Sequence, residues 1–232
     1  MEKNLQSRIG YFFIGILIVT LLGFNKTYFV KFPTFEGFTS AHHFHGTIAL
    51  LWLLMLIVQP FLIRAKKYEV HRMVGRVSYF LMPLLLASFF FVSRAGYYRN
   101  VNTIGEVEAL AKLTDGIPDI LFMAILYSLA IIYRKKTPLH MRYFIGTGLM
   151  VMGPGLGRYA FITFGPQIAI PILITLSLLL PFIWMIVDLI KKRSYIPMAV
   201  YLAIAVSSVL IKQNGHTEWW QTFAKWLASN LF

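Results

Sequence analysis

The sequence predicts an all-α fold, a polytopic transmembrane helix bundle with about seven spans. Hydrophobic residues make up 58% of the 232 residues. Charged residues make up only 13%, about half of their usual share in a soluble domain. The apolar residues lie in continuous runs of roughly 20, the length of helix that crosses the hydrocarbon core of a bilayer.

Seven apolar runs are the candidate spans, and together they form a single integral membrane domain. They cover residues 9–30, 44–63, 73–93, 117–133, 141–163, 167–190 and 195–212. The fifth and sixth runs are separated only by Phe164-Gly165-Pro166-Gln167, a turn signal because glycine and proline interrupt helices. A kink within the membrane at this point would reduce the count to six.

Two further helices are expected outside the spans. The longest polar stretch runs from Arg94 to Gly116, and within it residues 104–113 have the composition of a short surface helix. Residues 217–231 are expected to form an interfacial helix, because tryptophan favours the membrane interface. Five apolar side chains of this tail roughly share one helical face: Trp219, Trp220, Phe223, Trp226 and Leu227.

The charge distribution predicts how the chain lies in a bacterial inner membrane. Of the 22 lysines and arginines, 14 fall on the side of the N-terminus, mostly in the short loops 64–72, 134–142 and 191–195. Short basic loops stay in the cytoplasm, so we expect a cytoplasmic N-terminus and an external C-terminus. The net charge of +13 is expected to meet anionic lipid headgroups rather than nucleic acid.

A weak internal repeat predicts which spans form the core. Residues 64–75 and 134–146 both run from a basic loop into a span that opens with histidine and arginine. A proline and an arginine follow in each case, Pro83 and Arg94 in the first and Pro154 and Arg158 in the second. Two related hairpins predict a four-helix core made of the second to fifth spans. Basic inner loops imposed by topology alone would produce the same likeness.

Histidines at the outer start of the second span are candidate metal ligands. His42 and His45 share a helix face if the helix begins near Ser40, which is a good N-cap residue. Asp119, at the outer start of the fourth span, is the best candidate for a third ligand. Two histidines and a carboxylate suit zinc or non-haem iron. The alternative is that these histidines bind lipid headgroups and water.

Two histidines on the cytoplasmic side are candidate haem ligands. His71-Arg72 and His140-Met141-Arg142 each open a span. If these spans are neighbours, His71 and His140 form a bis-imidazole pair for haem b, and Arg72 and Arg142 hold its propionates. A quinone headgroup or a lipid phosphate could use the same groups. The alternative is simple binding of lipid phosphate by both histidines.

Arg94 and Arg158 are candidate ligand-binding residues near outer helix ends, because a charge close to hydrocarbon usually faces a cavity or the bundle interior. Arg158 follows Gly153-Pro154-Gly155-Leu156-Gly157, a run that permits close helix approach or local unwinding. A kinked helix with a snorkelling arginine is the alternative. Asp188 is expected to pair with Lys191 and Lys192 at a helix end.

No recognised catalytic motif is present, so catalytic residues stay unassigned. The chain has no cysteine, which excludes thiolate metal sites, iron–sulfur ligation and cysteine nucleophiles. The nucleophile elbow of hydrolases, the metalloprotease motif and the dinucleotide fingerprint are missing as well.

Several motifs carry a resemblance to a known family. They are the histidine that opens the second span, Trp52 to Pro60 with Gln59-Pro60, and His71-Arg72-Met73-Val74-Gly75-Arg76. With them, the chain resembles an uncharacterised family of bacterial multi-helix membrane proteins over residues 40–160. It is more distantly similar to small histidine-bearing membrane proteins that assist cytochrome oxidase maturation. Neither resemblance supplies catalytic residues that carry over to this chain.

Three functions are compatible with these patterns. The first is a haem- or metal-associated membrane protein in respiratory redox chemistry or its assembly. The second is a zinc-dependent membrane hydrolase that acts on a lipid-like substrate. The third is a transporter, or a structural subunit that contacts other membrane subunits and has no chemistry of its own.

Overall fold

A computed structural model describes residues 3–232, and every regular element in that part of the chain is a helix. This confirms the all-α prediction. In chain order the elements are α1 (Lys3–Asn25), η1 (Phe29–Lys31), α2 (Ser40–Arg64), α3 (Tyr68–Ile104), α4 (Glu106–Lys112), η2 (Leu113–Asp115), α5 (Ile117–Ile132), α6 (Thr137–Phe164), α7 (Pro166–Ile190), α8 (Ile196–Gln213) and α9 (Glu218–Leu231).

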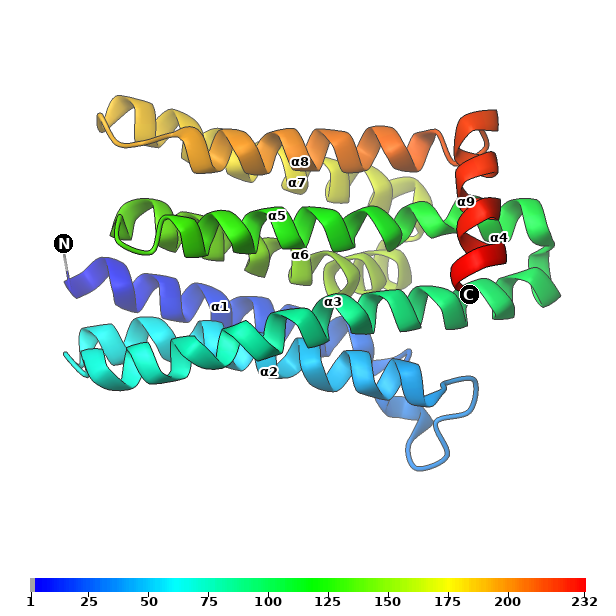
Figure 1. Ribbon diagram of the computed structural model, residues 1–232, viewed down its shortest axis with the longest axis horizontal. Helices are drawn as coiled ribbons and strands as arrows, with labels where there is room; N and C mark the ends of the chain where they lie inside the picture. Colours follow the sequence, from blue (N-terminus) through cyan, green and yellow to red (C-terminus); the bar gives the residue numbers. More distant parts are fainter. Residues whose placement is uncertain (1–2) are drawn as a thin grey trace.

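The long helices lie side by side along the length of the molecule, and α9 lies across one end of them (Figure 1). We call this the α9 end, and the other the basic-loop end, because short basic loops join α2 to α3, α5 to α6 and α7 to α8 there. Six helical stretches between residues 8 and 213 are long and apolar enough to cross a membrane. The chain is therefore a helical protein of membrane character. The α6 helix is not among the six, since its glycines, His140 and two arginines lower its hydropathy.

The boundary between α6 and α7 lies where the glycine–proline signal predicts it. Gly165 separates the two helices with a φ of 74°, a left-handed conformation that glycine adopts without strain. Pro166 then opens α7, where the missing N–H of proline has no helical acceptor to lose. Two distinct helices are therefore present here, rather than one kinked helix.

The α3 helix is much longer than the apolar run that predicts it. Its 37 residues span about 55 Å, well beyond the roughly 30 Å of a hydrocarbon core. The polar stretch expected after Arg94 is thus helical as far as Ile104, and the short helix expected at 104–113 is α4. Hydropathy marks only the residues that need lipid, whereas backbone hydrogen bonds continue a helix into water.

The main hydrophobic core draws on more helices than the four expected. It includes Ile9, Phe13 and Ile16 of α1 and Tyr201 of α8, in addition to residues of α2, α3, α5 and α6. The α1 helix approaches α6 closely, since a Cβ atom on Gly23 would lie 1.9 Å from the carbonyl oxygen of Gly155. The glycines before Arg158 therefore include one that serves helix packing.

The α9 helix packs on α4, and Phe232, just after it, contacts Phe90 and Tyr97 of α3. Trp220 Nε1 donates a hydrogen bond to the carbonyl oxygen of Leu110 at 2.9 Å. The five apolar side chains of α9 span an arc of about 120°, and they divide between the protein and its surroundings. Trp220 and Leu227 are buried, but Trp219, Phe223 and Trp226 are exposed. At about 100° per residue, the second group lies on a neighbouring stripe of the helix.

Candidate functional site

The predicted outer histidines have separate partners at the start of α2. Thr39 is the N-cap, one residue before the expected Ser40. Its backbone N–H donates to His42 Nδ1 at 3.2 Å, and its hydroxyl lies 2.9 Å from the same atom. His42 therefore belongs to a capping arrangement that satisfies the first turn of the helix.

His45 bonds across to α3. Its Nδ1 lies 2.9 Å from the hydroxyl oxygen of Ser88, which donates its own proton to the Leu85 carbonyl oxygen at 2.6 Å. A serine hydroxyl has one proton, so His45 must donate through Nδ1. The ring also packs edge-on against Phe89. His45 thus joins α2 to α3.

The histidine between them is held by the segment that precedes α2. His43 Nδ1 lies within hydrogen-bond distance of the Tyr28 hydroxyl, and its ring centroid is 5.1 Å from that of Phe35. Sequence reasoning did not assign this role to His43. The contact anchors the loop between α1 and α2.

The structure does not bring Asp119 to His42 and His45. Within residues 3–232 as described, no group of three histidine or carboxylate side chains is placed to hold a metal ion. The reason lies in the helix order, since α2 packs between α1 and α3 whereas α5 packs mainly on α6. Two other side chains on the same side of the molecule have partners of their own. Asp115 lies 3.5 Å from Lys212, and Glu108 lies 3.6 Å from His216.

Arg142 is committed to a buried ion pair at the basic-loop end. Its Nε and Nη2 atoms donate to the two carboxylate oxygens of Asp188 at 2.7 and 2.6 Å, and Nη1 donates to the Pro138 carbonyl oxygen at 2.9 Å. Both side chains are almost fully buried. Arg142 is therefore not free for a haem propionate, which corrects the prediction.

The same pair corrects the expectation for Asp188, which turns into the bundle toward α6 rather than pairing with the lysines that follow it. A carboxylate placed within an apolar run usually faces the protein interior, and this was the available signal. Which arginine would meet it depends on the packing of α6 against α7.

His140 is held in one tautomer. Its Nδ1 lies 2.8 Å from the carbonyl oxygen of Ala130, which can only accept, so Nδ1 carries the proton. The Nε2 atom is left with its lone pair. The ring packs edge-on against Phe144, with centroids 4.8 Å apart. Arg72, by contrast, is exposed and makes no side-chain hydrogen bond to a described residue.

Four side chains near the junction of α2, α3, α5 and α6 are considered together, and we call them the buried polar cluster after their buried polar atoms: the fully buried Trp52 and the half-buried Gln59, His71 and His140. Gln59 Nε2 donates to the His71 backbone carbonyl at 3.2 Å, which ties α2 to α3. His71 and His140 lie close enough that charges on them would repel each other. Three buried atoms have no hydrogen-bond partner in the described chain: Trp52 Nε1, Gln59 Oε1 and His71 Nδ1.

An aromatic wall borders this cluster. The ring of Trp52 lies 5.8 Å from that of Tyr127 and 6.0 Å from that of Phe144. The Tyr127 hydroxyl is 3.0 Å from Ser78 Oγ. The sequence analysis proposed the two histidines as ligands. It named Trp52 and Gln59 only within the motif that carries the family resemblance, and it missed Tyr127. Their polar atoms within apolar runs were the signal that could have found them.

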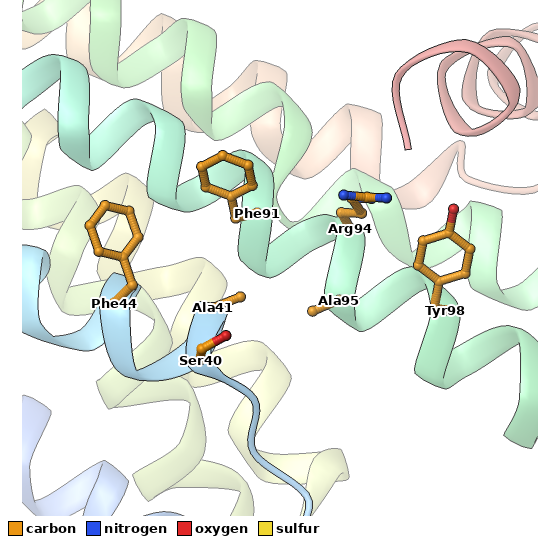
Figure 2. A pocket seen from close by; sticks show the side chains of 7 residues that line it. All are labelled: Ser40, Ala41, Phe44, Phe91, Arg94, Ala95 and Tyr98. Carbon is orange, nitrogen blue, oxygen red and sulfur yellow. The ribbon is translucent and has the colours of Figure 1, made fainter.

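The two predicted ligand-binding arginines lie in different surroundings. The Arg158 guanidinium lies 4.5 Å above the ring of Phe24 on α1. Arg94 lies 5.7 Å above the ring of Tyr98 and lines a groove of about 450 Å³ between α2 and α3 (Figure 2).

Comparison of the chain with protein-family models, curated proteins and solved structures finds no match.

Proposed function

We propose that the buried polar cluster holds a redox cofactor and that the protein acts in respiratory redox chemistry or its assembly. The supporting observation is the state of its two histidines. His140 presents Nε2 while a backbone carbonyl holds Nδ1–H, which is the usual arrangement of a metal-ligating histidine. His71 adds an unpartnered buried nitrogen from α3, and α5 packs against both α3 and α6. Bundle proteins build cofactor sites from the inward side chains of several helices.

The donor set suits a bis-imidazole haem b in part. His71 of α3 and His140 of α6 would each supply an imidazole nitrogen to a haem iron. No buried arginine is available for the propionates, since Arg142 pairs with Asp188 and Arg72 is exposed.

A quinone headgroup is the second candidate, favoured by the other unpartnered atoms. Trp52 Nε1 is a donor, and Gln59 Oε1 is an acceptor, yet neither atom ligates haem iron. A quinone offers carbonyl acceptors to the indole N–H, and a quinol offers a hydroxyl to the amide oxygen. The aromatic wall of Tyr127 and Phe144 suits a flat ring.

One purification distinguishes the two candidate cofactors. Protein extracted from native membranes in mild detergent should show either a Soret band or a quinone in the organic extract. His140→Ala and His71→Ala should remove the bound cofactor, while His45→Ala, a matched histidine with its own partner, should retain it. A protein that carries neither haem, metal nor quinone above background would refute the proposal.

The hydrolase and the transporter have less support. A zinc hydrolase requires a third ligand beside His42 and His45, and no such group is gathered in the described residues. The transporter or subunit hypothesis gains from the groove at Arg94, which offers a binding surface without chemistry. Copurification of a partner subunit from native membranes would favour a role within a complex.

We further propose seven spans with a cytoplasmic N-terminus, in which α6 crosses the membrane shielded by its neighbours. Its 28 residues are long enough, and it packs against α1, α5 and α7. The suggested core of α2, α3, α5 and α6 is the set that surrounds the buried polar cluster.

Orientation can be tested in this cysteine-free chain. An impermeant maleimide should label Glu106→Cys but not Glu69→Cys in intact cells, because the two residues are exposed at opposite ends of the bundle. Labelling of Glu69→Cys alone would invert the orientation.

A further inference from the structure

A groove at the α9 end opens between the start of α2 and the far part of α3. Its volume is about 450 Å³, and Figure 2 shows the side chains that line it. Ala41 and Ala95 point toward each other across the groove. Because both side chains are a single methyl group, the two helices leave a channel that a larger residue at either position would fill.

The lining changes from apolar to polar along the groove. Phe44 and Phe91, whose ring centroids are 6.5 Å apart, lie on the side toward the middle of the bundle. Arg94 and Tyr98 follow along α3 toward the helix end, and Ser40 lies at the first turn of α2. This order matches an amphiphile, with its chain toward the membrane centre and its headgroup toward water.

The polar part of the groove has an unneutralised positive charge. Arg94 lies over the Tyr98 ring at 5.7 Å, and no carboxylate of the described residues forms an ion pair with it. Arg94 is therefore the charged side chain among the residues that line the groove. A guanidinium matches the geometry of a phosphate through paired N–H donors.

We propose that this groove binds one anionic phospholipid. The phosphate would accept hydrogen bonds from Arg94, with the hydroxyl groups of Ser40 and Tyr98 within the same lining. One acyl chain would follow Phe44 and Phe91 between the helices. Charge complementarity selects an anionic headgroup over a zwitterionic one, and the apolar half of the groove selects a lipid over free phosphate.

Lipid titration tests this assignment. The full-length protein, stripped of lipid in non-ionic detergent, is titrated separately with phosphatidylglycerol, phosphatidylcholine and inorganic phosphate, and bound states are counted by native mass spectrometry. Arg94→Gln removes the charge, and Ala95→Leu fills the groove while leaving the arginine. Arg76→Gln, an exposed arginine near the basic-loop end of the same helix, is the matched control.

We expect phosphatidylglycerol to bind the wild-type protein and Arg76→Gln with equal affinity. Arg94→Gln should weaken it about tenfold, the size of effect expected when one charge-assisted hydrogen bond is lost. Ala95→Leu should also weaken it about tenfold, because its larger side chain occupies the space of the lipid. Ala95→Leu keeps the test open if Arg94→Gln does not fold. Equal affinity of wild type and both variants would overturn the site. Phosphatidylcholine binding as tightly would overturn its charge selectivity, and phosphate binding as tightly would overturn the lipid.

Discussion

At the α9 end, the Nδ1 atoms of His42, His43 and His45 all have a hydrogen-bond neighbour, whereas at the basic-loop end His140 has one and His71 has none. The α9-end histidines cap a helix or join two elements, so their chemistry is used by the fold. Of the three unpartnered buried atoms, two belong to Gln59 and His71 toward the basic-loop end, and the third belongs to Trp52 near the middle of α2. Histidines at helix starts thus look alike in sequence, and only their partners distinguish a packing role from a binding role.

A second contrast separates a buried charged pair from the neutral members of the buried polar cluster. Arg142 and Asp188 are charged, buried and fully bonded to each other. Trp52 and Gln59 are neutral, and each retains an unpartnered buried atom. An unpaired charge in low dielectric costs far more than an unpaired neutral group. The fold therefore had to pair the charges, while the neutral groups can serve a ligand.

Breaking the charge pair should have the largest effect. Arg142→Met leaves the Asp188 carboxylate buried without a partner and should lower the free energy of unfolding by about 3–5 kcal/mol. Thermal unfolding followed by circular dichroism in detergent measures this. The double variant Arg142→Met/Asp188→Leu should recover most of the loss, because the uncompensated charge is removed with its partner. A single variant as stable as wild type would place the pair outside the low-dielectric interior.

Two substitutions of Trp52 separate packing from hydrogen bonding. Trp52 is fully buried, so Trp52→Ala should cost about 3–5 kcal/mol through lost contacts and the cavity left behind. Trp52→Phe should cost less than half as much, because the ring retains most contacts and the indole N–H has no protein partner to lose. If Trp52→Phe cost as much free energy of unfolding as Trp52→Ala in the same assay, the indole N–H of Trp52 would have to donate a hydrogen bond within the protein.

The α9 end offers the converse test. Ser88→Ala removes the acceptor of the His45 Nδ1–H and should cost about 1–3 kcal/mol, the penalty for an unsatisfied buried donor. Ser177→Ala is the control, since that hydroxyl bonds only a carbonyl of its own helix. If the two variants were equally stable, His45 would have to be as unpartnered as His71, and the contrast between the two ends would fail.

The smallest effect is expected at the exposed pair of Lys212 and Asp115, which lie 3.5 Å apart. Lys212→Ala should change the free energy of unfolding by less than about 1 kcal/mol, because solvent screens exposed ion pairs. The difference from wild type should shrink further at high ionic strength. A salt-insensitive loss as large as that of Arg142→Met would mean that this end also buries its charges.

The sequence by itself determined which segments are helices of membrane character, because hydrophobicity over roughly 20 residues and glycine–proline breaks are properties of the local chain. It also pointed to His71 and His140, since histidine at the start of an apolar run is visible in one dimension. The sequence underestimated the length of α3, because hydropathy falls where the apolar run ends while helical hydrogen bonding continues beyond it.

Only the tertiary structure decided which polar groups meet. Arg142 pairs with Asp188 because α6 packs on α7. Asp119 is separated from His42 because α2 and α5 pack on α3 and α6 rather than on each other. Gln59 and Trp52 joined the histidines because α2 turns both toward the inside of the bundle. A hydrogen bond depends on distance and direction between atoms on different helices, and those follow from packing rather than from position along the chain.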